Sequence, residues 1–335
     1  MPLAMNASGL PQASGGNPTD YIDISFQRYV RNRVTSSAAH LVNGIPDYAY
    51  GPDFVLREKL RAMPGTFPFF KAITNQYVPY IKQVCNLDCL RVGPGQFPEI
   101  HEMTQDCARR LGIGMPTVYI YPDPSIINAY TIATEDDSPL IIIHSSVVER
   151  FTPGELKSII GHECGHIHNN HGIYNTAANI ILNAMSAGLP ILRQILSLLS
   201  LPLRYALQAW MRAAEVTCDR AGSICCDDLH DELTCLAKFL YGGAFDAGEI
   251  NLDAVLRQYD MLRSTPVRLL ELESDHPVPV RRLFAVKEFF NSELLYAWRP
   301  EWRTPDLQLI GKQELDARCE RYIGVIKSQK AKKKR

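Results

Sequence analysis

The residues with the clearest chemical potential are the hexapeptide Gly-His-Glu-Cys-Gly-His at residues 161–166. It contains the pattern H-E-x-x-H, in which His162 and His166 lie four residues apart and Glu163 follows the first of them. On an α-helix this spacing puts both imidazoles on one face, where they can bind one zinc ion. Glu163 can then hold a water molecule against the metal and take its proton. The alternative interpretation is a pair of ordinary surface histidines.

The residues before this pattern predict a helix with a well-defined beginning. Thr152 suits the N-cap position, Pro153 suits the first helical position, and Glu155 completes a capping box. The helix then has an apolar face, formed by Leu156, Ile159, Ile160 and Ile167. An H-E-x-x-H pattern inside a capped amphipathic helix favours the zinc site over surface histidines.

A later segment offers a third zinc ligand. Residues 210–225 are expected to be helical, and they carry Glu215 and Asp219 four residues apart on one face. Two histidines and a glutamate from a second helix form a catalytic zinc site that keeps one position for water. We therefore assign Glu215 as the third ligand and Asp219 as the acceptor of an N–H from a ligating histidine. The simpler alternative is a solvated pair of acidic residues.

Two further histidines close to the pattern are not expected to bind the metal. His168 and His171 lie two and five residues beyond His166, so a regular helix turns both away from the metal face. We interpret each as a capping or surface histidine, near a helix end that Gly172 closes.

The composition is that of a folded globular protein that has no charge-driven attraction to nucleic acid. The chain has 335 residues, 46% of them hydrophobic and 21% charged, enough for one large domain or two smaller ones. Its formal net charge of -1 excludes a general attraction to nucleic acid. The nine cysteines form no compact framework, so we expect reduced, mostly buried thiols. Residues 1–20 lack a basic start followed by an apolar run, which argues against a secretory signal and for the cytoplasm.

The remaining elements predict an α+β fold that is predominantly helical. Residues 117–121, 128–132 and 140–144 are rich in β-branched and aromatic side chains and read as three strands. They come directly before the capped helix, so we expect a small sheet beside it. Further helices are expected at about residues 54–62, 67–84, 100–111, 229–241, 252–262 and 283–290.

Two segments bear on membrane contact. Residues 177–209 are the most hydrophobic long stretch, but polar residues and prolines interrupt them before an unbroken run of about 20 residues is reached. A pair of buried helices joined near Pro190 is the simpler interpretation; a segment that dips into a membrane, or an apolar groove, is the alternative. Residues 327–335 contain six Lys or Arg, which reads as a solubilising tail or, alternatively, as a contact for anionic lipid.

The order of the motifs resembles a known family. Four segments carry the resemblance, namely Asn128-Ala129, residues 156–171, residues 212–220, and Asp275-His276-Pro277 with Arg282. Together they resemble the zinc metallopeptidases (gluzincins) that include the heat-shock protease HtpX and the CAAX prenyl endopeptidases. The resemblance covers about residues 95–290.

This resemblance has implications for the metal and for the fold. It implies a zincin-like metallopeptidase fold and one zinc ion per chain, bound by His162, His166 and Glu215. It also implies that Glu163 is the general base. These are the same residues that the spacing alone selects, so the two lines of reasoning agree on the metal site.

The resemblance also implies roles for residues outside the metal site, and the sequence differs from the family in two respects. It implies that His276 and Arg282 help to hold a tetrahedral oxyanion. Together with the strand interpretation, it makes Asn128 and Ala129 part of the edge along which an extended peptide pairs. The family's membrane members have clear transmembrane helices, which this sequence lacks, so a soluble or peripherally attached member is implied. Cys218 stands where a small residue such as alanine is usual.

The function that follows is a zinc-dependent endopeptidase that acts on protein or peptide substrates, in the context of protein quality control. It is expected in the cytoplasm, with membrane association as the alternative. A zinc-stabilised binding or holdase protein without hydrolysis, or a latent zymogen, remains as a second hypothesis. Glu163 favours the enzyme, because a structural zinc site does not need it and usually has a fourth Cys or His ligand.

The sequence also suggests a division of the chain. The expected parts are a flexible tail at 1–20, a helical N-terminal region at 21–94, a metallopeptidase domain at 95–290, a C-terminal helical extension at 291–326 and a basic tail at 327–335.

Overall fold

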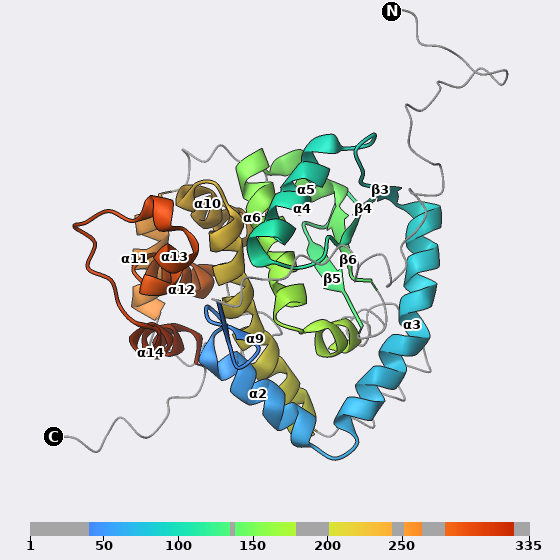
Figure 1. Ribbon diagram of the computed structural model, residues 1–335, viewed down its shortest axis with the longest axis horizontal. Helices are drawn as coiled ribbons and strands as arrows, with labels where there is room; N and C mark the ends of the chain where they lie inside the picture. Colours follow the sequence, from blue (N-terminus) through green and yellow to red (C-terminus); the bar gives the residue numbers. More distant parts are fainter. Residues whose placement is uncertain (1–39, 135–137, 179–200, 243–250, 263–278, 325–335) are drawn as a thin grey trace, which may run out of the picture.

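The computed structural model describes residues 40–134, 138–178, 201–242, 251–262 and 279–324. Two helices that pack along each other lie at its centre, α6 (Pro153–His168) and α9 (Leu201–Cys225). Helix α6 also packs against α4 (Pro98–Leu111) and α10 (Leu229–Tyr241). Figure 1 shows α9 running through the molecule beside α6, with the sheet on one side and the C-terminal helices on the other.

A four-stranded sheet covers one side of α6. Its strands lie in the order β3-β4-β6-β5, with bounds Leu90–Arg91 for β3, Thr117–Tyr121 for β4, Leu140–His144 for β6 and Ala129–Ile132 for β5. Strands β4 and β6 are parallel, while β3 and β5 are antiparallel to their neighbours. Strand β5 is therefore an edge strand of this sheet, and it contacts α6.

The other described elements surround this centre. Their bounds are β1 Leu41–Val42, β2 Ile45–Pro46, α2 Gly51–Ala62, α3 Thr66–Asp88, α5 Ser145–Arg150, α11 Leu252–Leu262, α12 Pro279–Phe290, α13 Glu293–Trp298, the 3-10 helix η5 Pro300–Trp302 and α14 Lys312–Ile323. Helix α2 packs against α9, and α12 packs against α9, α10 and α14. Figure 1 shows α2 beside the lower part of α9.

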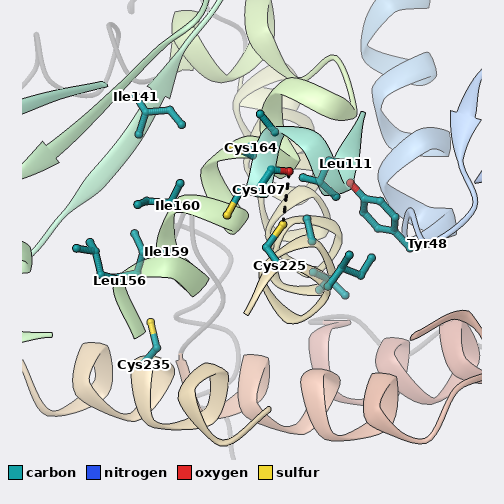
Figure 2. Close-up of a cluster of buried hydrophobic side chains, with 14 of the residues drawn as sticks. Tyr48, Cys107, Leu111, Ile141, Leu156, Ile159, Ile160, Cys164, Cys225 and Cys235 are labelled. Carbon is teal, nitrogen blue, oxygen red and sulfur yellow. Dashed lines mark hydrogen bonds between the residues drawn. The ribbon is translucent and has the colours of Figure 1, made fainter. Parts of the chain in front are cut away.

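The main core lies between α4, α6 and α9 and contains several thiols. Cys107, Cys164 and Cys225 come from these three helices and lie among buried aliphatic side chains (Figure 2). The Cys225 thiol donates to the carbonyl of Cys107, at 3.9 Å. All nine cysteines are free and eight are buried, as expected for reduced thiols.

Most expected elements are present; α3 and α12 extend about four residues beyond their predicted bounds, and the end of α6 also differs from the prediction. The described structure is predominantly helical with a small sheet, as the sequence indicates. The three strands and the capping box of Thr152 and Glu155 are confirmed. Helix α6, however, ends at His168 and not near Gly172, where a new helical segment begins. Asn170 has a left-handed backbone (φ 54°), which changes the direction of the chain between the two helices.

Several predictions fall wholly or largely outside the described residues. They concern the tails at 1–20 and 327–335, most of the apolar stretch at 177–209, and His276. Within the part of the chain that the structure describes, none of the helices combines the length and apolar character needed to span a bilayer.

Candidate metal centre

The two histidines of the H-E-x-x-H pattern point from α6 toward α9. Their rings lie one helical turn apart, with centroids separated by 5.3 Å. The side chains of His162 and His166 are only 13% and 6% exposed. The surface-histidine alternative is therefore wrong for this pair.

Glu215 of α9 faces both rings with its two carboxylate oxygens. Its Oε2 lies 3.6 Å from Nε2 of His162, and its Oε1 lies 3.6 Å from Nε2 of His166. Ligand atoms at zinc–ligand distances of about 2.1 Å in a tetrahedron lie about 3.4 Å apart. Each carboxylate oxygen thus lies close to ligand spacing from one imidazole nitrogen, which is compatible with a zinc ion shared by the three side chains. Its carboxylate is buried, so the solvated-pair alternative is also wrong.

Two glycines allow α6 and α9 to approach closely enough for this arrangement. A Cβ atom on Gly165 would lie 2.7 Å from Cβ of Ala221 and 3.1 Å from Cα of Cys218. A Cβ atom on Gly161 would lie 2.5 Å from Cβ of Cys225. Any larger residue at either position would push α9 away, and with it the carboxylate of Glu215.

His162 is held on its outer side by an acidic residue and an arginine. Its Nδ1 lies 3.0 Å from Oδ1 of Asp219, as predicted for Asp219. Arg282 of α12 donates to both Asp219 oxygens, at 2.9 and 2.5 Å, and its Nη1 lies 3.0 Å from Oε2 of Glu215. Burial alone would raise the pKa of Asp219, but Arg282 and His162 hold it below its usual value.

His166 has a different partner on its outer side, namely His171. The Nδ1 atoms of the two rings lie 3.1 Å apart, and Nε2 of His171 lies 2.9 Å from Oδ2 of Asp53 on α2. The side chain of His171 is 0% exposed, so the expectation of a surface position is wrong, although its backbone N–H does bond to the carbonyl of His166. His168 is half-buried, and its Nδ1 lies 3.0 Å from the hydroxyl of Tyr48.

The side chain of Glu163 extends from α6 toward β5, the edge strand of the sheet. Its side chain is 5% exposed, and its Oε2 accepts a hydrogen bond of 2.7 Å from the hydroxyl of Thr131 on β5. The same hydroxyl lies 3.0 Å from the backbone carbonyl of Glu163. Thr131 therefore fixes the Glu163 carboxylate in the cavity that the two histidines also line. The sequence pattern gives no sign that Thr131 contacts Glu163.

A cavity of about 290 Å³ opens onto these groups. One wall is the start of the edge strand, with Asn128, Ala129 and Tyr130, and the floor carries the α6 and α9 side chains described above. Helix α10 contributes the apolar side chains of Cys235, Leu236 and Phe239 to the lining. Such a cavity has room for substrate side chains beside the histidines and Glu163.

Glu232 adds a fourth buried carboxyl to the cavity lining, after Glu163, Glu215 and Asp219. It accepts a hydrogen bond from the hydroxyl of Ser158. Burial, with a further contribution from the charge of Asp219, raises the pKa of Glu232 to about 8. The sequence reasoning did not single out this residue, because nothing in its local pattern distinguishes it from a solvated helix residue.

Cys218 is a second candidate ligand beside Glu215. Donor atoms of His162, His166 and Cys218 lie within 4.8 Å of one another. The thiol, however, lies 3.7 Å from Nδ1 of His171, the nitrogen that faces the outer edge of the His166 ring. Burial, together with nearby carboxylates, raises the pKa of Cys218 well above its usual value in the metal-free protein. Glu215, which faces both Nε2 atoms, is the better third donor.

The structure brings together most residues that the sequence selected. His162, Glu163, His166, Glu215, Asp219, Arg282, Asn128 and Ala129 all line one cavity. His276 lies outside the described residues.

Comparisons with known proteins agree with the motifs. The model of peptidase family M48 matches residues 94–289. The chain is 31% identical over 297 residues to the plastoglobule-localized metallopeptidase 48 of Arabidopsis thaliana chloroplasts, a match that covers 84% of this chain and 85% of that protein. It is 29% identical over 89 residues to a protease HtpX homolog of Sulfurihydrogenibium, covering 27% of this chain but only 30% of that protein. The crystal structure of S. mikatae Ste24p aligns with a TM-score of 0.38 at 14% identity, over 70% of this chain and 65% of that chain.

Proposed function

The chain belongs to peptidase family M48, and we propose that it is a zinc-dependent endopeptidase that hydrolyses protein or peptide substrates. Family membership makes it a metallopeptidase, a hydrolase of the metalloprotease class. The zinc ion, the endopeptidase activity and the residue roles given below are the parts that we propose. A role in protein quality control is a further proposal, supported by the similarity to HtpX homologs.

The observation that supports the proposal most directly is the convergence of His162, His166 and Glu215. Two Nε2 atoms, each 3.6 Å from a different oxygen of one carboxylate, form a three-donor set of the kind found in catalytic zinc sites. We propose these three residues as the ligands of one zinc ion per chain. Zinc supplies Lewis acidity, which lowers the pKa of water and polarises a carbonyl group.

Glu163 is the proposed general base. It takes a proton from the attacking water and then passes this proton to the nitrogen of the leaving amine. Its hydrogen bond from Thr131 restricts the rotation of the carboxylate and keeps it at the cavity. Because Thr131 belongs to β5, the same strand that we expect to pair with the substrate also positions the base.

The edge strand β5 is the proposed docking site for an extended substrate. Its described pairing is with β6 alone, and its first residues line the cavity together with the preceding Asn128. A peptide that adds to this edge gains affinity from backbone hydrogen bonds with little selection for sequence. The apolar wall from α10 supports a preference for an apolar side chain next to the cleaved bond.

Arg282 and His276 are proposed to stabilise the oxyanion, as the family resemblance implies. For Arg282, support comes from its place in the cavity wall and from its Nη1, which lies 3.0 Å from Oε2 of Glu215. Its positive charge is thus close to the position where a carbonyl oxygen would become negative. Its contacts with Asp219 and Glu215 give it a second role, that of holding these carboxylates in place.

Membrane association is proposed through the apolar stretch at 177–209 or the basic tail at 327–335. The Arabidopsis relative is localised to plastoglobules, which supports an association of this chain with a subcellular structure of that kind. Cytoplasmic localisation stays a prediction from the sequence. The non-catalytic holdase alternative gains no support, because the relatives are peptidases.

Zinc content and casein cleavage, measured for the purified wild type beside Glu163→Gln, test the function. We expect near-equimolar zinc in both proteins, because Glu163 is not a ligand, and cleavage by the wild type alone. Removal of one general base should slow cleavage by at least about 100-fold. Retained cleavage by Glu163→Gln would contradict the mechanism, and zinc in both proteins with cleavage in neither would contradict the endopeptidase function of the isolated chain.

A further inference from the structure

A chain of three buried side chains connects a proposed zinc ligand to helix α2. His166 on α6, His171 after α6 and Asp53 on α2 are joined by contacts of 3.1 Å between the two Nδ1 atoms and 2.9 Å between Nε2 and Oδ2. The side chains of His171 and Asp53 are 0% and 3% exposed, so no solvent competes for these contacts. Asp53 lies well before residue 94, where the family match begins.

The contacts allow a single consistent assignment of protons. A His166 that gives its Nε2 lone pair to zinc carries its proton on Nδ1 and donates it to Nδ1 of His171. His171 then has its own proton on Nε2, where it donates to the carboxylate of Asp53. A neutral His171 and an ionised Asp53 are the forms that this assignment needs.

Asp53 is itself held as a carboxylate by further donors. Its Oδ1 accepts from the indole N–H of Trp210 at 2.9 Å, and its Oδ2 accepts from the hydroxyl of Thr217 at 2.7 Å. The Thr217 hydroxyl in turn accepts a hydrogen bond of 3.1 Å from the backbone N–H of Tyr50, which is the N-cap residue of α2. Asp53 lies in the first turn of α2, where the helix dipole favours a negative charge.

We propose that Asp53, acting through His171, is a positioning residue for the metal ligand His166, so that helix α2 is part of the metal centre. This inference rests on the zinc site of the proposed function. The carboxylate fixes the tautomer and orientation of His171, and His171 does the same for His166, which makes Nε2 of His166 a stronger and better oriented donor. The outer N–H of His162 reaches its carboxylate directly, whereas that of His166 reaches one through a second imidazole.

The test is the zinc dissociation constant, measured by chelator competition for four full-length proteins. Asp53→Asn is expected to raise this constant about 10- to 100-fold, the usual cost of removing an outer hydrogen-bond partner of a ligand. Thr217→Val disturbs the same buried cluster but keeps the carboxylate, and it should change the constant less than about threefold. Glu58→Gln removes an exposed carboxylate from the same helix and should change nothing. An unaltered constant in Asp53→Asn, or equal losses in Asp53→Asn and Thr217→Val, would overturn the proposal.

A second measurement on the wild type covers the case in which Asp53→Asn does not fold. Long-range ¹H–¹⁵N spectra of the zinc-loaded, histidine-labelled protein report which nitrogen of each ring carries the proton. His171 is expected as the Nε2–H tautomer and His166 with its proton on Nδ1. A proton on Nδ1 of His171 would overturn the proposal, because that nitrogen could not then accept from His166.

The two proposals fail in different ways. If the zinc constants shift as expected and no variant or wild type cleaves casein, the positioning role stands and the endopeptidase function fails. If the wild type cleaves casein and Asp53→Asn binds zinc normally, the positioning role alone fails. A wild type without zinc affinity would overturn both.

Discussion

The two histidines of the metal centre are supported in contrasting ways. His162 contacts Asp219 directly, on the helix that also carries Glu215, and Arg282 neutralises this carboxylate from the cavity wall. His166 contacts His171, and the carboxylate behind it, Asp53, belongs to a helix outside the family match. The first support is ionic and borders the cavity, whereas the second is a fully buried set of hydrogen bonds.

This difference teaches how much of a metal centre a local pattern can encode. Asp219 follows Glu215 by one helical turn. One helix therefore presents Asp219 to Nδ1 of His162 and Glu215 to the Nε2 atoms of both histidines. Asp53 and His171 meet only because α2 packs against α9 and because the chain turns after α6. One support is thus contained in a short segment, and the other exists only in the folded chain.

The largest effect is expected where both supports converge, at Glu215. Replacing Glu215 by Gln removes a proposed ligand shared by both rings and should weaken zinc binding by more than about 100-fold, since even outer partners cost 10- to 100-fold. Cys218→Ala, in the same helix, is the matched control and should bind zinc as the wild type does. Chelator competition measures both. Loss of zinc in Cys218→Ala with retention in Glu215→Gln would reverse the assignment of the third ligand.

The next effect concerns the ionic support. Asp219→Asn should weaken zinc binding about 10- to 100-fold, because the outer N–H of His162 loses its charged acceptor. It should also lower the free energy of unfolding by about 1–3 kcal/mol, because the buried Arg282 keeps fewer acceptors. Denaturant titration of the metal-free protein measures this second loss.

Combining Asp219→Asn with Asp53→Asn sharpens the comparison further. Among the described residues Asp219 and Asp53 have different hydrogen-bond partners, so their losses in zinc-binding free energy should add to within about 0.5 kcal/mol. A coupling well above that value would mean that the two supports act as one network and that the contrast drawn between them is wrong.

The smallest effect on metal binding is expected from Glu232. This residue should instead make the free energy of unfolding depend on pH. Its pKa of about 8 in the folded protein exceeds that of an unfolded glutamate, so folding binds a proton that the unfolded chain releases. The resulting stability is complete below about pH 4.3 and is lost as pH rises to 8 and above, at no more than about 1.4 kcal/mol per pH unit. Measured without metal, the unfolding free energy of the wild type relative to Glu232→Gln should fall over this range. A difference independent of pH would contradict the raised pKa.

The sequence predicted the centre of the site well because its signals are local. The capping residues, the H-E-x-x-H spacing and the spacing of Glu215 from Asp219 each depend on one helix, and all are found as expected. The zincin-like detail of the fold and the oxyanion role of His276 stay predictions.

The residues that sequence reasoning missed depend on tertiary packing. His171 was placed off the metal face by assuming a regular helix, but α6 ends at His168 and the left-handed Asn170 turns the chain back. Asn accepts this conformation more readily than most residues, so the pair Asn169-Asn170 was the available signal for a helix end. Thr131 and Asp53 carry no comparable signal, since only the packing of β5 and α2 brings them to the site.

The most direct test of the metal centre is X-ray absorption at the zinc K-edge of the full-length wild-type protein loaded with one equivalent of zinc. The account predicts a first shell of nitrogen and oxygen only, at about 2.0–2.2 Å, with the multiple-scattering signature of two imidazoles. Cys218→Ala should give the same spectrum. A sulfur scatterer at about 2.3 Å that disappears in Cys218→Ala would contradict the assignment of Glu215 and identify the thiol as the third ligand.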